Sequence, residues 1–435
     1  MFGVGPDPGR GFTAGLERRA TTMKMGYCWV GVMCAMLIAA PVGAATHGGT
    51  VESPDLPSFE GTFAFTGVNV LPMDGERVLE DHTVVVVDGV ITAVGPASSV
   101  TVPAGATVID GEGRWLMPGL AEMHAHVPPV PQNGPQRPPA QVLGDIFFLY
   151  IANGITTIRG MLGSPYQLDL REEIRAEQHL APDFWVAAPS INGNSAPTPA
   201  DAERMIRDAA AAGYDLMKIH PGVSRATWDR MVEVADEVGL TFGGHVPADV
   251  GIAHALETGL STVDHVDGYL EGASAGGGNP ATIVETLDEN RMRALARRTA
   301  EVGAFVVPTM FLWENLYSKP NSDAMLALPE MRYVSQGQRD AWRNQNAGGP
   351  DLPTPVVEAF LDARNRMLRY LAEAGAPILM GTDSPQLFNV PGFALHRELA
   401  VMREAGLSNF VILESGTRNV ARYVDEILGE PADFG

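Results

Sequence analysis

The sequence predicts a (β/α)8 barrel that follows a small β-sandwich portion. Short apolar strand candidates alternate with amphipathic helices over about 280 residues, and eight such repeats match the count and length of a (β/α)8 barrel. A doubly wound parallel sheet fits the same alternation, but no glycine-rich phosphate loop follows any strand candidate. The eight candidates span residues 116–126, 156–159, 184–188, 216–219, 241–245, 262–265, 305–309 and 378–383.

Residues 1–45 are expected to be a secretory signal peptide. A basic start, an apolar stretch and a run of small residues follow one another there, in the order typical of a cleaved export signal. The apolar stretch is short for a membrane span, so an uncleaved anchor is the weaker alternative and no stable membrane insertion is expected after cleavage. Met23 or Met25 would be a more usual start, which makes the preceding residues a candidate for a miscalled upstream extension. The segment comprises Arg18, Arg19 and Lys24, then 26–40 and 41–45.

The net charge and the positions of the cysteines limit the kinds of partner and the cellular compartment. The 435-residue chain carries a formal net charge of −22 at pH 7. Such a surface repels a phosphate backbone, so nucleic-acid binding is disfavoured. Both cysteines, Cys28 and Cys34, lie inside the signal segment, so the mature chain would have no disulfide. We therefore expect an exported protein, periplasmic or secreted. The sequence leaves open whether it forms a homo-oligomer.

A β-rich segment precedes the barrel. Residues 46–60 contain Gly, Ser and Pro and are predicted to be a linker, and residues 61–115 are predicted to form the β-sandwich portion. Its strand candidates are 62–71, 82–88 and 91–94, with turn signals at Met73-Asp-Gly75 and Val87-Asp-Gly89. These patterns predict a small antiparallel sheet.

The barrel itself is predicted over residues 116–429. One helix within it is well defined by its ends: Ser224 is a plausible N-cap and Gly239 a plausible stop, with Trp228 and Met231 on the apolar face between them. The long proline-containing stretch 311–365 lies between the last two strands and is expected to hold helices and an active-site lid.

Six residues of metal-binding type lie at predicted strand ends, where the catalytic groups of such barrels are found. His124 and His126 are two residues apart on one strand and therefore project from the same face. Imidazole and carboxylate groups are common ligands of zinc-like metals. The other four residues are Lys218, inside an otherwise apolar strand, and His245, His265 and Asp383.

Each of these residues has an ordinary explanation when taken alone. Lys218 could extend its ammonium group to solvent, Asp383 could be a helix N-cap, and either later histidine could be a polar residue beside a turn. Six compatible residues at successive strand ends favour a shared metal site instead.

The chain resembles the amidohydrolase superfamily at these positions. The segments Met117-Pro-Gly-Leu-Ala-Glu-Met-His-Ala-His126, Gly243-Gly-His-Val-Pro247, Val263-Asp-His-Val-Asp-Gly268 and Leu379-Met-Gly-Thr-Asp-Ser-Pro385 are similar to its strand motifs. The nearest branch is the imidazolonepropionase-like and Xaa-Pro dipeptidase-like one, in which a strand-four lysine precedes the strand-five histidine. The resemblance covers about residues 61 to 429 and implies a (β/α)8 barrel with a metal centre and a small β-sandwich.

The resemblance also implies a role for each ligand candidate. His124, His126 and Asp383 would hold the more buried of two divalent metal ions, with zinc as the expected ion. A water shared by the two metals would have a lowered pKa and act as a hydroxide nucleophile. Asp383 would orient that water, accept its proton and pass the proton to the leaving amine.

The second ion would be held by His245 and His265 and would polarise the scissile carbonyl. Lys218 would be N-carboxylated by carbon dioxide and bridge both ions. Carboxylation turns a cation that repels metals into an anionic oxygen ligand.

Three further residues are candidates for substrate binding. His220 shares a strand face with Lys218, although a loop histidine beside Pro221-Gly222 is an equal alternative. Tyr269 follows strand six and Arg159 ends strand two. For both, ordinary packing is the competing explanation.

The predicted activity is hydrolysis of a C–N bond, an amide, in a small molecule such as an N-acyl amino acid, a dipeptide or a cyclic amide. The same chemistry would open lactones or cleave phosphotriesters. A mononuclear deaminase is the second hypothesis, which Lys218 disfavours, and a non-enzymatic metal-binding protein is the third.

The sequence departs from the family pattern in two places. Arg159 is followed by Gly160 where the family often has aspartate. Family members also continue beyond the position of Gly435 with strands that complete the sandwich, so an incomplete sandwich with an unpaired edge and poor stability is expected here.

Overall fold

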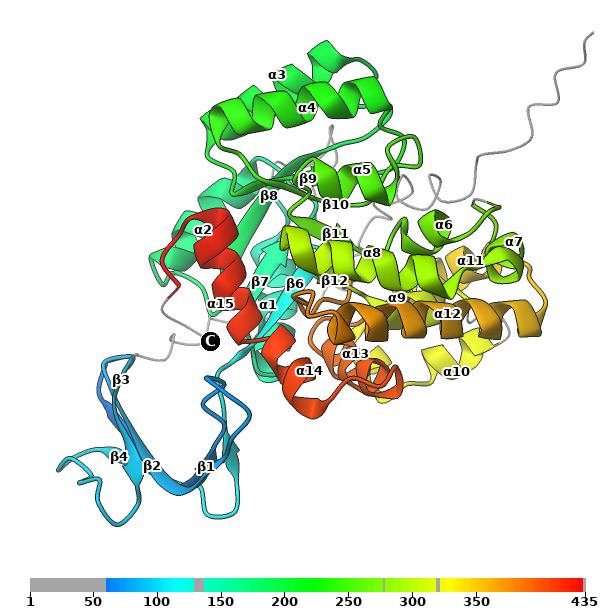
Figure 1. Cartoon of the computed structure of the whole chain (residues 1–435). Helices are drawn as coiled ribbons and strands as arrows, with labels where there is room; N and C mark the ends of the chain where they lie inside the picture. The colour runs from blue at the N-terminus through cyan, green and yellow to red at the C-terminus, as the bar shows by residue number, and fades with distance from the viewer. Residues whose placement is uncertain (1–59, 129–136, 277, 318–320, 433–435) are drawn as a thin grey trace, which may run out of the picture.

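The computed structural model describes residues 60–128, 137–276, 278–317 and 321–432. Within these residues a parallel barrel surrounded by helices lies beside a separate small sheet (Figure 1). The predicted signal peptide and nearly all of the predicted linker lie outside the described residues. None of the helices among the described residues is both long and apolar enough to cross a membrane.

The small sheet is built on a meander, as the turn signals predicted. β1 pairs antiparallel with β2, and β2 with β3, through a tight turn at Asp88 (φ 48°) and Gly89 (φ 80°). Positive φ at both central residues matches the twist of the flanking strands. The sheet is not purely antiparallel, because β4 and β5 pair parallel with β1. The strands are β1 (Thr62–Val70), β2 (Leu79–Val87), β3 (Val90–Pro96), β4 (Thr107–Asp110) and β5 (Trp115–Leu116).

Seven parallel strands form the barrel in the order of the sequence, from β6 to β12. The predicted eighth strand, 378–383, appears as two isolated parallel bridges, Val306 to Ile378 and Ala125 to Ser384. The first bridge pairs β12 with this segment and the second pairs the segment with β6, so the segment closes the barrel. The predicted (β/α)8 barrel is therefore confirmed. The strands are β6 (Leu120–Ala125), β7 (Ile155–Gly160), β8 (Asp183–Ile191), β9 (Leu216–Ile219), β10 (Phe242–Gly244), β11 (Thr262–Asp264) and β12 (Phe305–Val307).

Helices cover the outside of the barrel (Figure 1). They are α1 (Ala140–Ala152), α2 (Tyr166–Arg175), α3 (Pro199–Ala212), α4 (Arg225–Val238), α5 (Gly251–Glu257), α6 (Tyr269–Ala273), α7 (Pro280–Thr286), α8 (Glu289–Val302), α9 (Met310–Leu316), α10 (Ser322–Leu326), the 3-10 helix η2 (Pro329–Tyr333), α11 (Gln336–Ala347), α12 (Thr354–Glu373), α13 (Phe393–Glu404), α14 (Asn409–Ser415), α15 (Arg418–Tyr423) and the π-helical turn η3 (Val424–Leu428).

The helix predicted from Ser224 is α4. The Ser224 hydroxyl accepts a hydrogen bond from the Thr227 N–H at 3.3 Å, and Gly239 ends the helix in the left-handed region at φ 71°. Trp228 and Met231 are fully buried on its inner face. A capping oxygen satisfies an N–H that the helix leaves free, which explains why a local sequence pattern identified both ends.

The N-terminal end of the barrel is closed by α15. Val420 and Tyr423 pack against Met123 of β6 and Phe305 of β12 in an apolar cluster of their own. Closure at this end leaves the opposite, C-terminal end of the barrel as the place where strand-end side chains gather.

Candidate metal centre

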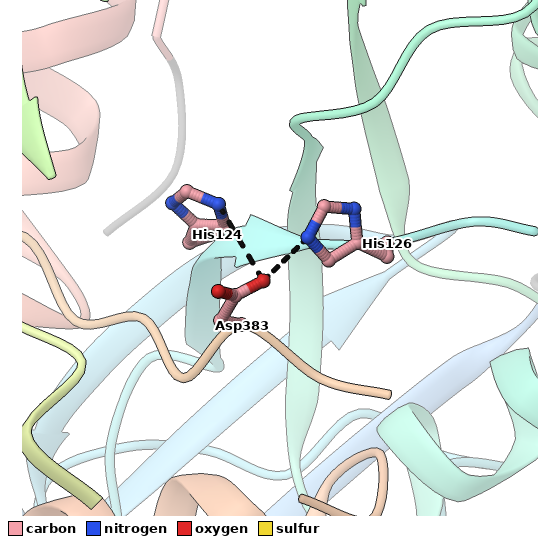
Figure 2. Close-up of side chains that lie close together, drawn as sticks. All are labelled: His124, His126 and Asp383. Atoms are coloured by element: carbon pink, nitrogen blue, oxygen red, sulfur yellow. Dashed lines mark hydrogen bonds and ion pairs between the residues drawn. The ribbon is translucent and has the colours of Figure 1, made fainter. Parts of the chain in front are cut away.

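His124, His126 and Asp383 form one cluster at the C-terminal end of β6. One ligand atom from each lies within 4.8 Å of the others. Figure 2 shows Asp383 Oδ1 facing both imidazoles: it contacts His126 Nε2 and lies 3.6 Å from His124 Nε2. The eighth-strand segment carries Asp383 to β6 because Ser384 O accepts a hydrogen bond from the His126 N–H at 2.8 Å.

The other three ligand candidates adjoin this cluster. The ring centroid of His265 lies 4.5 Å from that of His124 and 4.4 Å from that of His245. Lys218 is fully buried on β9, with its Nζ 3.2 Å from His124 Nε2. The barrel therefore brings all six sequence-predicted ligand candidates together.

Two imidazoles of this group, those of His124 and His265, are held in the neutral form that binds a metal. Burial, followed by the charge of nearby Lys218, holds the pKa of His124 well below its usual value. Burial and the neighbouring His245 have the same effect on the pKa of His265. His265 Nδ1 lies 2.8 Å from Thr309 Oγ1, while its buried Nε2 has no hydrogen-bond partner among the described residues. A buried, neutral nitrogen without a partner fits a metal ligand.

Two carboxylates to which the sequence assigned no role contact the Nδ1 atoms of two of the histidines. Asp267 Oδ2 lies 2.6 Å from His245 Nδ1, and Asp264 Oδ2 lies 2.8 Å from His124 Nδ1. Carboxylates at the far nitrogen of a ligating histidine orient the ring and raise its basicity. The run Asp264-His265-Val266-Asp267, with two acids around one ligand candidate, is the signal that could have identified them.

Glu122 was also missed, and it joins β6 to the eighth-strand segment. Its carboxyl accepts hydrogen bonds from the backbone N–H of His124 at 3.1 Å and of Thr382 at 2.7 Å, and from the Thr382 hydroxyl at 2.5 Å. Burial raises the pKa of Glu122 to about 8 against the opposing effect of these donors. The residue thus holds the two segments that present His124 and Asp383.

Backbone strain gathers at the same end of the barrel. His265, Thr309 and Asp383 have φ values of 63°, 45° and 65°. Residues other than glycine rarely adopt a positive φ, which costs about 1–3 kcal/mol for each residue. Such strain persists where the surrounding structure imposes it, and it is concentrated at functional sites.

Gly244 explains how β10 can pass so close to Lys218. It has a φ of 131°, and a Cβ at this position would lie 2.5 Å from the Ile219 carbonyl oxygen and 3.0 Å from Lys218 Cδ. The glycine next to His245 is therefore required by close approach of the neighbouring strand.

The three substrate-binding candidates have different surroundings. His220 lies beside the cluster, with its ring stacked 5.2 Å from that of His245. Tyr269 is fully buried and its hydroxyl bonds with the Thr299 hydroxyl of α8 at 2.7 Å, so it faces the helix layer. Arg159 is fully buried inside the barrel, where its Nε donates to the Met123 carbonyl at 2.8 Å. Packing and buried partners surround both side chains, as the competing explanation expected, and the substrate-binding role of Tyr269 and Arg159 stays a prediction.

Comparison with curated proteins gives matches that cover only part of this chain and of each relative. No protein-family model matches the chain. An imidazolonepropionase from Stenotrophomonas maltophilia is 42% identical over 65 residues, which are 14% of this chain and 16% of the relative. Adenine deaminase 3 from Rhizobium meliloti is 26% identical over 206 residues, which are 46% of this chain and 35% of the relative. The chain thus matches well under half the length of these curated relatives.

Solved structures match over most of the chain. A bottromycin amidohydrolase superposes with a TM-score of 0.64 at 24% identity, covering 88% of this chain and 81% of the neighbour. A Xaa-Pro dipeptidase with bound methionine in its active site superposes with a TM-score of 0.59 at 16% identity, covering 85% and 90%. At these identities the likeness establishes a shared fold.

Proposed function

We propose that this chain is a metal-dependent hydrolase of a C–N bond from the amidohydrolase superfamily, with resemblance to the imidazolonepropionase-like and Xaa-Pro dipeptidase-like branch of that superfamily. The observation that carries the proposal is the convergence of four histidines, a buried lysine and an aspartate at one end of the barrel. Two divalent ions held there, zinc as the expected species, would supply Lewis-acid activation of a water and of the scissile carbonyl.

We assign one ion to His124, His126 and Asp383. Their ligand atoms already lie within 4.8 Å of one another, and the set of two imidazoles and one carboxylate suits zinc. The Gln386 amide also donates a hydrogen bond to Asp383 Oδ2, which leaves Oδ1 toward the histidines. Asp383 would accept a proton from the attacking water and deliver it to the leaving nitrogen.

We assign the second ion to His245 and His265, with Lys218 between the two positions. A buried ammonium beside neutral imidazoles would repel a cation, so Lys218 is proposed to react with carbon dioxide. The ammonium would first lose one proton, and the lone pair of the neutral Nζ would then form a bond to the carbon of carbon dioxide. One C=O bond of carbon dioxide would become a C–O⁻ bond and the nitrogen would release a second proton, so that the resulting carbamate would offer anionic oxygens to both positions. The support for this assignment is the 3.2 Å separation of Lys218 Nζ from His124 Nε2.

The proposed substrate is a small molecule with an amide bond, such as an N-acyl amino acid, a dipeptide or a cyclic amide. A mononuclear deaminase is the second candidate, since an adenine deaminase is among the relatives that match over the largest share of the chain. Lys218 argues for the amide hydrolase, because a deaminase with one ion has no use for a bridging lysine. Lactone and phosphotriester hydrolysis use the same groups and belong in the same substrate screen.

The deciding experiment is metal content per chain after purification with bicarbonate and zinc. The parent chain is compared with Lys218→Ala, and His254→Ala is the matched control because its ring pairs with Asp229 on the helix layer. We expect two metals in the parent and the control, and at most one in Lys218→Ala. One metal in all three proteins would favour the deaminase, and none in the parent would refute the metal centre.

Export remains a separate proposal, supported by the basic, apolar and small-residue order of residues 1–45. N-terminal sequencing of protein recovered from the periplasm or medium should find the chain cut near Ala45. An intact leader on protein retained in the cytosol would contradict export.

A further inference from the structure

A fully buried polar network runs along the inside of the barrel from α15 toward the candidate metal centre. It consists of Tyr423, Arg159 and Asp264, and we call it the axial network. Arg159 Nη1 donates to the Tyr423 hydroxyl at 3.0 Å, and Arg159 Nη2 lies 3.5 Å from Asp264 Oδ1. The other oxygen, Asp264 Oδ2, lies 2.8 Å from His124 Nδ1 and 3.8 Å from Lys218 Nζ.

Stability alone is a poor reason for this arrangement. Removing an arginine and a carboxylate from water costs several kcal/mol each, and well-packed apolar residues often serve a core equally well. The side chains of Arg159 and Asp264 are both 0% exposed. A buried pair is better explained where one of its members is needed by a third group.

That third group is His124. Either imidazole nitrogen can carry the proton of a neutral ring, and the partner of one nitrogen decides which lone pair is left on the other. Asp264 lies at Nδ1, while Nε2 faces Asp383 and Lys218. The contact at Nδ1 is a close approach of 2.8 Å and not a hydrogen bond, because neither His124 Nδ1 nor Asp264 Oδ2 has a hydrogen-bond partner among the described residues. The carboxylate nevertheless favours a proton at Nδ1 and leaves the Nε2 lone pair for a metal.

We propose that Asp264 is a positioning residue that fixes the orientation and tautomer of His124, and that Arg159, held by Tyr423, keeps the Asp264 carboxylate in place. The metal part of this inference rests on the proposed function. The tautomer part does not, because it concerns the contact between Asp264 and His124 in the protein without metal.

The main test is the double variant Arg159→Met with Asp264→Leu, which removes both charges and leaves neither partner buried alone. The matched control is Arg171→Met with Asp215→Leu, because Arg171 and Asp215 form another largely buried pair, 2.8 Å apart, at the start of β9. The single variant Asp264→Asn retains one acceptor oxygen and is expected to keep part of the effect of Asp264 on His124. Circular dichroism and thermal unfolding establish that each protein is folded.

Two readouts separate positioning from general damage. Chelator competition measures zinc affinity, which should fall about 10–100-fold in the main variant, less in Asp264→Asn, and remain unchanged in the control. Nitrogen-15 NMR of histidine-labelled, metal-free protein, which has ten histidines, should show His124 protonated at Nδ1 in the parent and shifted toward Nε2–H in the main variant.

The possible results distinguish the positioning role of Asp264 from the proposed metal-dependent function. Unchanged zinc affinity and tautomer in a folded main variant would overturn the positioning role, as would an equal loss of affinity in the control. If the main variant does not fold, an Asp264→Asn protein with parental affinity and tautomer would overturn it as well. A parent that binds no zinc would refute the proposed function, while the His124 tautomer would still decide the contact with Asp264.

Discussion

Glu398 is a fully buried carboxyl whose protonation should make the stability of the fold depend on pH. It lies on α13 and accepts hydrogen bonds from the backbone N–H groups of Met310 and Phe311 at 2.8 and 2.7 Å, at the start of α9. Thr309, which contacts His265, immediately precedes these two residues. Burial raises the pKa of Glu398 from an ordinary 4.5 to about 7, against the opposing effect of the two donors.

The direction of the effect follows from where the proton is held. Between pH 4.5 and about 7 the folded chain retains a proton that the unfolded chain has released. The associated stabilisation is therefore fully present below pH 4.5 and is lost as the pH rises through about 7. At about 1.4 kcal/mol for each pH unit in this interval, the free energy of unfolding should fall by about 3 kcal/mol.

Urea unfolding of the parent chain and of Glu398→Gln, followed by circular dichroism from about pH 4 to about pH 8, measures this loss. Glutamine copies the neutral carboxyl and does not titrate, so the stability of Glu398→Gln relative to the parent should rise by about 3 kcal/mol across the range. Other titrating groups are common to both proteins and cancel. The control is Glu373→Gln, at an exposed position of α12, which should show no such change. Parallel curves for the parent and Glu398→Gln would refute the reasoning.

Three further outcomes are expected. Gly244→Ala should destabilise the chain and reduce its zinc content, because the new Cβ would lie 2.5 Å from the Ile219 carbonyl oxygen and 3.0 Å from Lys218 Cδ; parental thermal stability and metal content would contradict this. Ser224→Ala should cost about 1 kcal/mol in urea unfolding, since the Thr227 N–H loses its capping acceptor, and it should leave zinc content unchanged. Dialysis against a chelator should abolish amide hydrolysis and lower the thermal midpoint, and added zinc should restore both; a midpoint indifferent to zinc would argue against a bound ion.

Much of the fold was predictable because its signals are local. An apolar strand followed by an amphipathic helix is a pattern within about 35 residues, and repeating it eight times indicates the barrel. The ends of α4 were predictable for the same reason. The Ser224 hydroxyl accepts a hydrogen bond from the N–H three residues ahead, and Gly239 ends the helix in a left-handed conformation. The six ligand candidates were identified because strand ends in a barrel meet at one rim.

The sequence by itself therefore determined the barrel and the residues that gather at its C-terminal end. Tertiary structure decided what each buried polar side chain contacts. Arg159 ends a predicted strand, but its partners, Tyr423 and Asp264, are more than one hundred residues away and come from α15 and β11. Glu122 likewise meets Thr382 across 260 residues. The physical reason is that strand periodicity specifies which face a side chain occupies, whereas the partner of a buried charge depends on which distant segment closes over that face.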